Sequence, residues 1–251
     1  MKLMLMRELR EGWRSFRLPG VLLGAVFFAL LQPPSQKYMD VIMGLFAEGI
    51  EIELPPVTPD SVLVGFAGDL TSMILIAAIV VCMGIVAREK HNGLTEWFLT
   101  RPVSRSSYVY AKVIYLVIFT LVVVAVSTAV CAAYTSTLVG SVNVAGVFYL
   151  IVLVTTYLML PLIVTLTVSA ITGISGAAAG AGILVLFLMS SLGWLLDNAG
   201  INWLPTQLSA HLPEVIAGYP SPSFWVATAL SWLFIALMAQ LSNYNFARQE
   251  V

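Results

Sequence analysis

The stretch from Val113 to Leu196 contains no Asp, Glu, Lys, Arg or His. A soluble domain would have to enclose all of these residues in one core, which surface-to-volume scaling does not allow for a chain of 251 residues. The composition agrees, since 59% of the residues are hydrophobic and only 10% are charged, which is far from the globular norm. The stretch therefore predicts an all-α membrane protein.

A helix needs about 20 mostly apolar residues to cross the hydrocarbon layer of a membrane. Segments of this kind predict six transmembrane helices within one domain covering residues 1–251. The predicted spans are about 18–32, 64–87, 111–136, 146–170, 176–196 and 223–242. The first is short because Pro33-Pro34 follows its apolar run, and Trp13 and Phe16 are candidates to lengthen it.

Basic residues predict the orientation, because cytoplasmic loops carry the excess of Lys and Arg. If six spans alternate, every basic residue except Lys37 falls on one side, so both termini are expected in the cytoplasm. We expect a multi-pass protein of a bacterial plasma membrane. The residues expected on the inner side are Lys2, Arg7, Arg10, Arg14, Arg17, Arg88, Lys90, Arg101, Arg105, Lys112 and Arg248.

Residues 1–17 combine a basic face with an apolar face that repeats at helical spacing. The apolar positions are Leu5, Leu9, Trp13 and Phe16, which predicts an amphipathic helix lying in the membrane interface. A signal peptide is disfavoured because no small-residue cleavage site follows. The arginines have a second interpretation, in which they only set the topology, and the two interpretations are compatible.

Two longer segments are expected outside the cell, at 33–63 and 197–222. In the first, Tyr38, Val41, Ile42, Leu45 and Phe46 repeat at helical spacing, which predicts a short surface helix before a turn-rich linker. The second segment either dips into the membrane as a pair of short helices or floats above it, and the sequence does not separate these alternatives.

The segment 88–112, which contains the predicted coupling loop 88–110, carries five of the twelve Lys and Arg residues between two apolar segments. Asn92-Gly93 predicts a turn, and a short helix should follow it and end at or before Arg101, because Pro102 comes next. Trp97 and Phe98 would lie on one face of this helix with Leu94. Such an aromatic pair suits either a pocket on a partner protein or the bilayer interface, where Arg101 and Arg105 would contact lipid phosphates.

This loop resembles the first cytoplasmic loop of the type-2 ABC transporter permeases, which has a pattern similar to E-x-x-x-G-x-x-E-x-x-L-x-R-P-V-S-R-x-x-Y-x-x-x-K. The one departure is that Leu94, and not Thr, follows the glycine; Thr95 comes one place later. The resemblance covers the span layout of the whole chain, but at residue level only this loop and, loosely, the basic N-terminus. The matching residues are Glu89, Gly93, Glu96, Leu99, Arg101, Pro102, Val103, Ser104, Arg105, Tyr108 and Lys112.

The resemblance implies the permease subunit of an exporter, in which this loop forms a coupling helix that receives force from an ATPase. It implies two ABC ATPase subunits as partners, which would bind the ATP and Mg, and a second permease, either another copy or a related chain. It also implies an interfacial elbow helix at 1–17. The implied coupling residues are Glu89, Gly93, Leu94, Glu96, Trp97, Phe98, Arg101, Pro102 and Arg105.

Two pairs of glycines lie four residues apart within predicted spans, Gly20 with Gly24 and Gly176 with Gly180. Small residues at this spacing let two helices approach closely in lipid. Permeases of the resembled family pair through their first and fifth spans, so these glycines are candidates for dimer packing. Packing inside one subunit is the open alternative.

Motifs for chemistry within the chain are missing from the sequence. There is no Gly-x-x-x-x-Gly-Lys-Ser/Thr and no His-Glu-x-x-His, and His91 and His211 are expected on opposite sides of the membrane. We therefore expect no enzyme activity, cofactor, metal or nucleic-acid partner for this chain. Cys82 and Cys131 are expected to be apolar fillers of the spans.

The predicted path lacks charge, which suits an apolar or amphipathic substrate such as a peptide, a drug or a lipid-like molecule. An ion-coupled secondary transporter or channel is the alternative function, and it would require charged or strongly polar residues near the midplane. Asp69 is the acid within a predicted span. An intramembrane carboxylate is a functional candidate, but an interfacial role at the start of a helix near Gly68 is favoured here. Other polar residues that could line a path or bond within the helices are Ser127, Thr128, Tyr157 and Ser169.

Overall fold

A computed structural model describes residues 2–39, 41, 56–92, 105–198 and 200–248. Within these residues the chain is helical with no strand, and six helices are long and apolar enough to cross a membrane. The prediction of an all-α protein with six such helices is confirmed, and each predicted range lies within one of them. They are Arg17–Lys37, Pro59–His91, Ser106–Leu138, Val144–Thr172, Ser175–Leu196 and Pro222–Phe246.

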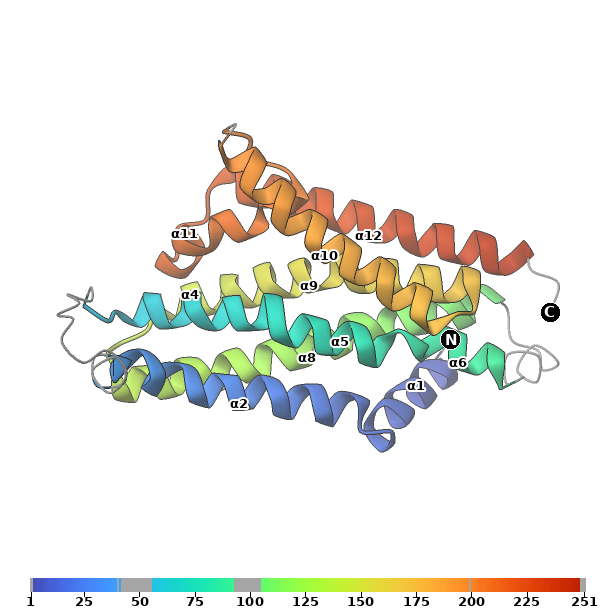
Figure 1. The fold of residues 1–251 in the computed structure, drawn as a ribbon, viewed down its shortest axis with the longest axis horizontal. Coiled ribbons are helices and arrows are strands. Elements are labelled where there is room, and N and C mark those ends of the chain that lie inside the picture. The colour runs from blue at the N-terminus through green and yellow to red at the C-terminus, as the bar shows by residue number, and fades with distance from the viewer. Residues whose placement is uncertain (1, 40, 42–55, 93–104, 199, 249–251) are drawn as a thin grey trace.

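The long helices run side by side along the long axis of the molecule (Figure 1). Helix α9 (Val144–Thr172) is central: it packs against α8 (Arg105–Leu138), α10 (Ser175–Asn198) and α12 (Pro222–Arg248), and most of its side chains are buried. Helix α10 crosses the bundle at an angle and is largely exposed. The two cysteines are buried free thiols, Cys82 in the second span and Cys131 in α8.

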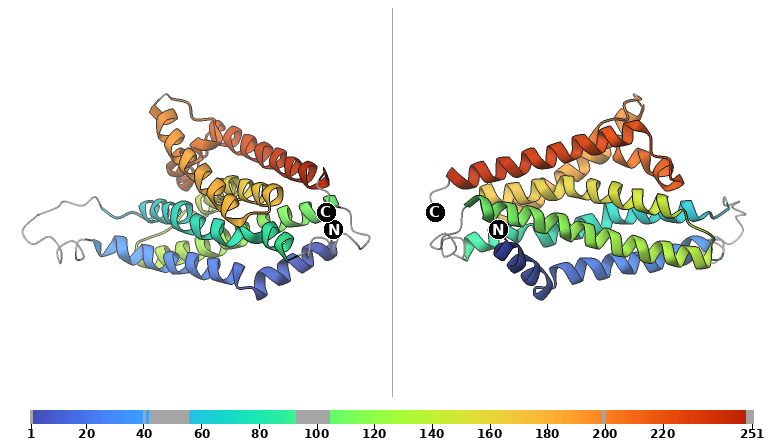
Figure 2. Two further views of the ribbon diagram at one scale, coloured as in Figure 1. Left: turned by 45° about the vertical axis from the view of Figure 1, so that its right-hand side comes forward. Right: turned by 180° about the vertical axis from the view of Figure 1, so that it is seen from behind.

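Helix α1 (Lys2–Arg14) ends before the first span and bends away from α2 (Arg17–Lys37), as Figure 2 shows from behind. Phe16 makes this bend with φ of 57°, a left-handed conformation that is uncommon for a residue with a side chain. The expected lengthening of the first span by Trp13 and Phe16 is therefore wrong. Helix α2 gains its length at the other end, where it continues through Pro33 and Pro34.

The second long helix is interrupted twice. Helix α4 (Pro59–Asp69) passes into a π-helical segment, η1 (Leu70–Ile74), then into α5 (Leu75–Cys82), and a break at Met83 separates α5 from α6 (Gly84–His91). The helix begins at Pro59, where Thr58 and Ser61 form a capping box. Asp69 is therefore not near the start of a helix, and that expectation is wrong: ten residues separate it from Pro59, or about 15 Å along the axis.

A short hairpin folds back between α10 and α12. It consists of a 3₁₀ helix, η2 (Pro205–His211), and α11 (Leu212–Ala217), which packs against α9 and α4. The approach is close, because a Cβ atom built on Gly146 of α9 would lie 2.0 Å from the carbonyl oxygen of Ile216. Buried His211 holds the hairpin, with Nδ1 against the Glu214 carboxylate and Nε2 2.8 Å from the Asn202 carbonyl oxygen.

The bundle has two distinct ends (Figure 1). At one, called the loop end here, lie α1, the end of α6, the start of α8 and the end of α12. At the other, the hairpin end, lie α11 and the start of α4. His91 and His211 belong to opposite ends, since His91 closes α6 and His211 closes η2. The predicted surface helix with Ile42, Leu45 and Phe46 lies outside the described residues.

Candidate functional site

The predicted coupling residues mostly fall between α6 and α8, where residues 93–104 lie outside the described residues. Arg105 is the first residue of α8, and Glu89 lies in the last turn of α6. The structure thus describes the helices that precede and follow this segment in the sequence. The residues outside it are Gly93, Leu94, Glu96, Trp97, Phe98, Arg101 and Pro102.

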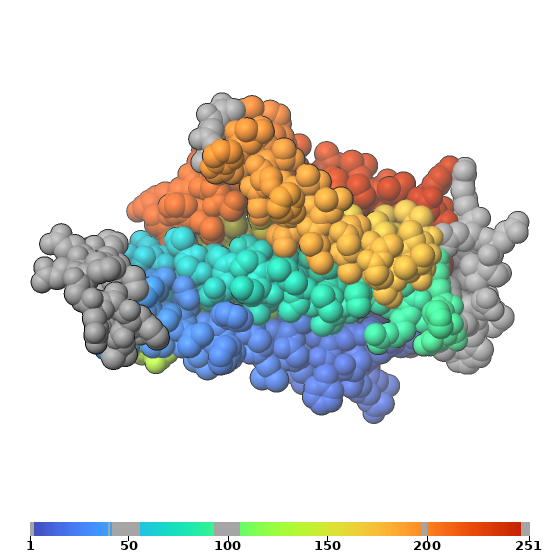
Figure 3. Space-filling view, viewed as in Figure 1, coloured from blue at the N-terminus to red at the C-terminus, as the bar shows by residue number. Residues whose placement is uncertain are grey.

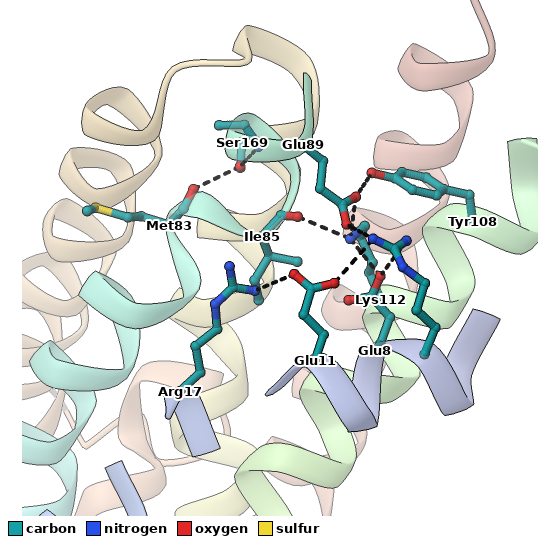
Figure 4. A network of polar contacts seen from close by, with 11 residues as sticks. Glu8, Glu11, Arg17, Met83, Ile85, Glu89, Tyr108, Lys112 and Ser169 are labelled. Atoms are coloured by element: carbon teal, nitrogen blue, oxygen red, sulfur yellow. Dashed lines mark hydrogen bonds and ion pairs between the residues drawn. The ribbon is translucent and has the colours of Figure 1, made fainter. Parts of the chain in front are cut away.

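Lys112 of α8 is the centre of a buried polar network at the loop end (Figure 4). Only 1% of its surface is exposed. Its Nζ donates to Glu8 Oε1 at 2.9 Å and to the Ile85 carbonyl oxygen at 3.1 Å, and it lies 2.8 Å from Glu89 Oε2. An ammonium group has three donors, so these three oxygens satisfy Lys112 completely.

Glu89 of α6 is the acid that joins the network to both sides. Its Oε1 accepts from Arg7 of α1 at 2.9 Å, and its Oε2 accepts from the hydroxyl of Tyr108. Tyr108 lies one turn before Lys112 on α8, and the Lys112 ammonium also lies over its ring, 4.8 Å from the centroid. We call Arg7, Glu8, Glu89, Tyr108 and Lys112 the root cluster, because Glu89 shortly precedes the 93–104 segment in the sequence and Tyr108 and Lys112 shortly follow it.

Glu8 connects helix α1 to the root cluster through its contact with Lys112. Burial raises the pKa of its carboxyl above the ordinary value, while the Lys112 ammonium opposes that rise and the Glu89 carboxylate adds to it. Further out, Glu11 pairs with Arg7 at 3.2 Å and with Arg17 at 3.7 Å. Three acids, Glu8, Glu11 and Glu89, thus face three cations, Arg7, Arg17 and Lys112, so the full network is balanced in charge.

Two further helices pack against the root cluster. The ring of Tyr108 stacks on Phe246 of α12 with centroids 5.1 Å apart. Lys90 of α6 donates to the Ala170 carbonyl oxygen near the end of α9 and lies 5.5 Å from the Phe246 ring centroid. Helices α1, α6, α8, α9 and α12 therefore meet at the place where the 93–104 segment is attached.

The break between α5 and α6 lies next to this cluster and has a specific cause. The Ser169 hydroxyl of α9 donates to the Met83 carbonyl oxygen at 2.9 Å and accepts from the Ala87 amide at 3.0 Å (Figure 4). In an unbroken helix, the Ala87 amide would donate directly to the Met83 carbonyl. A side chain inserted into this ladder bends a helix, and the helix is interrupted here at Met83, between α5 and α6.

Sequence reasoning named part of this site. Glu89, Tyr108 and Lys112 appear in the resembled pattern, and the spacing of Tyr108 and Lys112 predicts one helix face. Their partners Arg7 and Glu8 were missed, because a pairing across 104 residues of chain leaves no local signal. Ser169 was noted only as a polar residue within a span. Of the others, Ser127 donates to the Val123 carbonyl of its own helix, and Tyr157 is buried in α9.

A comparison with protein families matches residues 45–249 to a family described as "Protein of unknown function (DUF2705)". The chain belongs to the DUF2705 family. A curated relative of this DUF2705 member is the "Uncharacterized transmembrane protein YxlG" of Bacillus subtilis (strain 168), which is 24% identical over 254 residues. That alignment covers 100% of this chain and 98% of the relative.

The extent of the two matches bears on the site. The DUF2705 match contains Glu89, Tyr108 and Lys112, whereas Arg7 and Glu8 precede it. The similarity to the Bacillus protein spans the full chain and so includes α1. Both descriptions leave the activity open, and the relative's name agrees with a protein built of membrane-spanning helices.

Proposed function

We propose that the chain is the permease subunit of an ATP-driven ABC exporter for an apolar or amphipathic substrate. The observation that carries this proposal is the root cluster, in which one buried lysine joins the helix before the 93–104 segment, the helix after it and helix α1. The segment has the residue pattern of a coupling helix. A push on it would reach α6 and α8 together.

The free-energy cost of burying the charges of the root cluster supports a role for the cluster in positioning α6 and α8. Burying charges is expensive, and apolar residues of similar volume often stabilise a fold as well or better. A loop that only connected two spans would need no such network. The break at Met83 would act as a hinge in this proposal: α6 would change its angle to α5 while the Ser169 hydroxyl keeps the Met83 carbonyl and the Ala87 amide satisfied.

The proposed topology places the loop end in the cytoplasm. Both α1 and the end of α12 lie at that end, together with the basic residues of α1 and α6. Helix α1 would lie on the membrane surface as an elbow before the first span. Its outward side carries Leu3, Met6 and Trp13, which are exposed in the isolated chain and would contact lipid.

The glycines favour pairing with a second permease. A Cβ atom built on Gly20, Gly176 or Gly180 would meet no other described atom within 4 Å, while one on Gly24 would lie 3.6 Å from Ile74. Three of the four therefore face open space. Figure 3 shows α2, α5 and α10 together on one face of the molecule, and we propose that a second copy or a related permease packs against it.

Co-purification tests the proposed function most directly. The tagged chain would be extracted from its native membranes in a mild detergent, and the bound proteins assayed for ATP hydrolysis. We expect an ATPase subunit to accompany the wild-type chain. A Glu96→Arg/Trp97→Ala double variant should insert into the membrane normally but lose the ATPase, because both changes fall on the proposed docking helix.

A matched control is a Trp203→Ala variant, which removes a half-exposed Trp near the hairpin end and should keep the ATPase. If the wild-type chain carries no ATP-hydrolysing partner, the proposal is wrong. Transport at the normal rate by the Glu96→Arg/Trp97→Ala variant would also contradict it.

One observation favours the alternative, an ion-coupled transporter or channel. Among the described residues Asp69 Oδ2 is buried with no hydrogen-bond partner, and the π-helical segment η1 follows it directly. Such segments often occur at functional sites. An Asp69→Asn variant separates the two functions: an ion-coupled carrier would lose its dependence on the ion gradient, whereas an ATP-driven exporter would keep ATP-dependent transport.

A further inference from the structure

Helix α1 presents different residues to the bundle and to the outside. Met4, Glu8 and Gly12 face the bundle, where a Cβ atom on Gly12 would lie 2.2 Å from the Tyr115 hydroxyl. On the outward side, Met6 and Trp13 lie seven residues apart, and so on one helix face, and are 57% and 62% exposed. A row of arginines borders this apolar stripe, at positions that share one helix face; they are Arg7, Arg10 and Arg14.

The arginine row lines a groove of about 430 Å³, with Glu11 and Ser15 as its other walls. Glu11 is already engaged by Arg7 and Arg17. Arg10 and Arg14 are exposed and form no ion pair within the part of the chain that the structure describes. The groove therefore has an excess of positive charge and two guanidinium groups ready for an anion.

The chemistry of the groove matches a phosphate attached to acyl chains. A guanidinium group presents donors in a fork that fits phosphate oxygens, and the Ser15 hydroxyl adds a donor. A soluble phosphate would make no use of the exposed stripe beside the groove, whereas the acyl chains of a lipid would cover it. Basic amphipathic helices bind anionic membranes in this arrangement.

We propose that the α1 groove binds the phosphate of an anionic phospholipid. This rests on the proposed placement of α1 at the cytoplasmic surface of the membrane. Arg10 and Arg14 hold the headgroup. Arg7, which lines the groove and also belongs to the root cluster, adds a third positive charge. Because Arg7 also donates to Glu89, the bound lipid lies next to the root of the coupling segment.

Native mass spectrometry of the intact chain in detergent, with equal amounts of phosphatidylglycerol and phosphatidylcholine, tests this site. We expect the wild-type chain to retain phosphatidylglycerol in preference. The Arg10→Gln/Arg14→Gln variant should bind it about 30-fold more weakly, the loss expected when two basic side chains leave an anionic lipid surface. The Arg10→Lys/Arg14→Lys variant should keep most of the binding because it retains both positive charges, which would show that substitution at these two exposed positions leaves the chain folded.

The matched control is Arg88→Gln, which removes an exposed arginine at the same end of the molecule but outside the groove, and it should bind as the wild type does. Equal retention of the two lipids, or unchanged binding by the glutamine double variant, would overturn the proposal. Displacement of the lipid by millimolar glycerol 3-phosphate would assign the groove to a soluble anion instead. Lipid retention is read without any ATPase, so its outcome and that of the ATPase co-purification are independent.

Discussion

At the residue scale, Lys112 determines how the loop end is assembled. It is a lysine inside a long apolar helix, and all of its donors are used by α1 and α6. Its removal would leave the buried carboxylates of Glu8 and Glu89 close together with Arg7 as the neighbouring cation. The two acids would then lack the ammonium group that now lies against both of them.

We expect Lys112→Met to destabilise the protein by about 3–5 kcal/mol, the range for breaking a buried ion pair from one side. Thermal unfolding in detergent, followed by tryptophan fluorescence, would measure the change. The control Lys37→Met alters an exposed lysine that donates to the Leu138 carbonyl and should have a small effect. Combining Lys112→Met with Glu8→Gln should cost less than the sum of the two; strict additivity would show that they are not coupled.

Glu8 predicts a pH dependence of stability. Burial raises its pKa in the folded chain, so the folded state binds the proton more tightly than the unfolded state does. Protonation of Glu8 contributes fully to the free energy of unfolding below the ordinary pKa of about 4.3. This contribution is lost as the pH rises through the raised pKa of the folded chain. In thermal unfolding from pH 4 upward, Glu8→Gln should remove this decline and Glu11→Gln should retain it. Parallel curves for wild type and Glu8→Gln would contradict the assignment.

At the element scale, the second span shows what sequence can and cannot predict. Its existence follows from hydropathy, because the apolar residues between Val62 and Ala87 are a local signal. Its interruptions do not follow, since the break at Met83 depends on a serine 86 residues away in another helix. The role of Asp69 was misjudged for a related reason, as the helix begins earlier than its apolar run. The two prolines of α2 likewise suggested an end where the helix continues.

The helix break at Met83 makes a prediction of its own. In Ser169→Ala the Met83 carbonyl and the Ala87 amide lose their shared partner and should bond to each other, as they do in a regular helix. Hydrogen exchange at residues 83–87 should become slower than in the wild type. Ser127→Ala, which removes a hydroxyl bonded within its own helix, is the control. Faster exchange in Ser169→Ala would mean that the serine only stabilises a break with another cause.

At the scale of the whole molecule, the glycines separate contacts within one chain from contacts between chains. Gly146 is packed against the backbone of α11, whereas Gly180 of α10 faces open space. The sequence did not distinguish them, because both are small residues in apolar helices. Only the folded bundle shows which faces are covered, and α10 is the long helix that is least covered among those described.

We therefore expect opposite results from two substitutions. Gly146→Ala should destabilise the chain by about 1–3 kcal/mol, since the new methyl group overpacks a contact with backbone atoms. Gly180→Leu should leave the stability of the monomer unchanged but weaken pairing with a second permease. Thermal unfolding and light scattering of the detergent complexes measure the two effects. A Gly180→Leu variant that pairs as well as the wild type would remove α10 from the interface.

The root cluster also has a consequence for the order in which the chain is made. Glu8 and Glu89 emerge from the ribosome before Lys112, which lies 104 residues after Glu8. A nascent chain that has inserted only two spans thus holds both acids near the surface without their lysine. Helix α1 is secured when the third span enters the membrane, so the docking of α1 is completed by a helix that is made later.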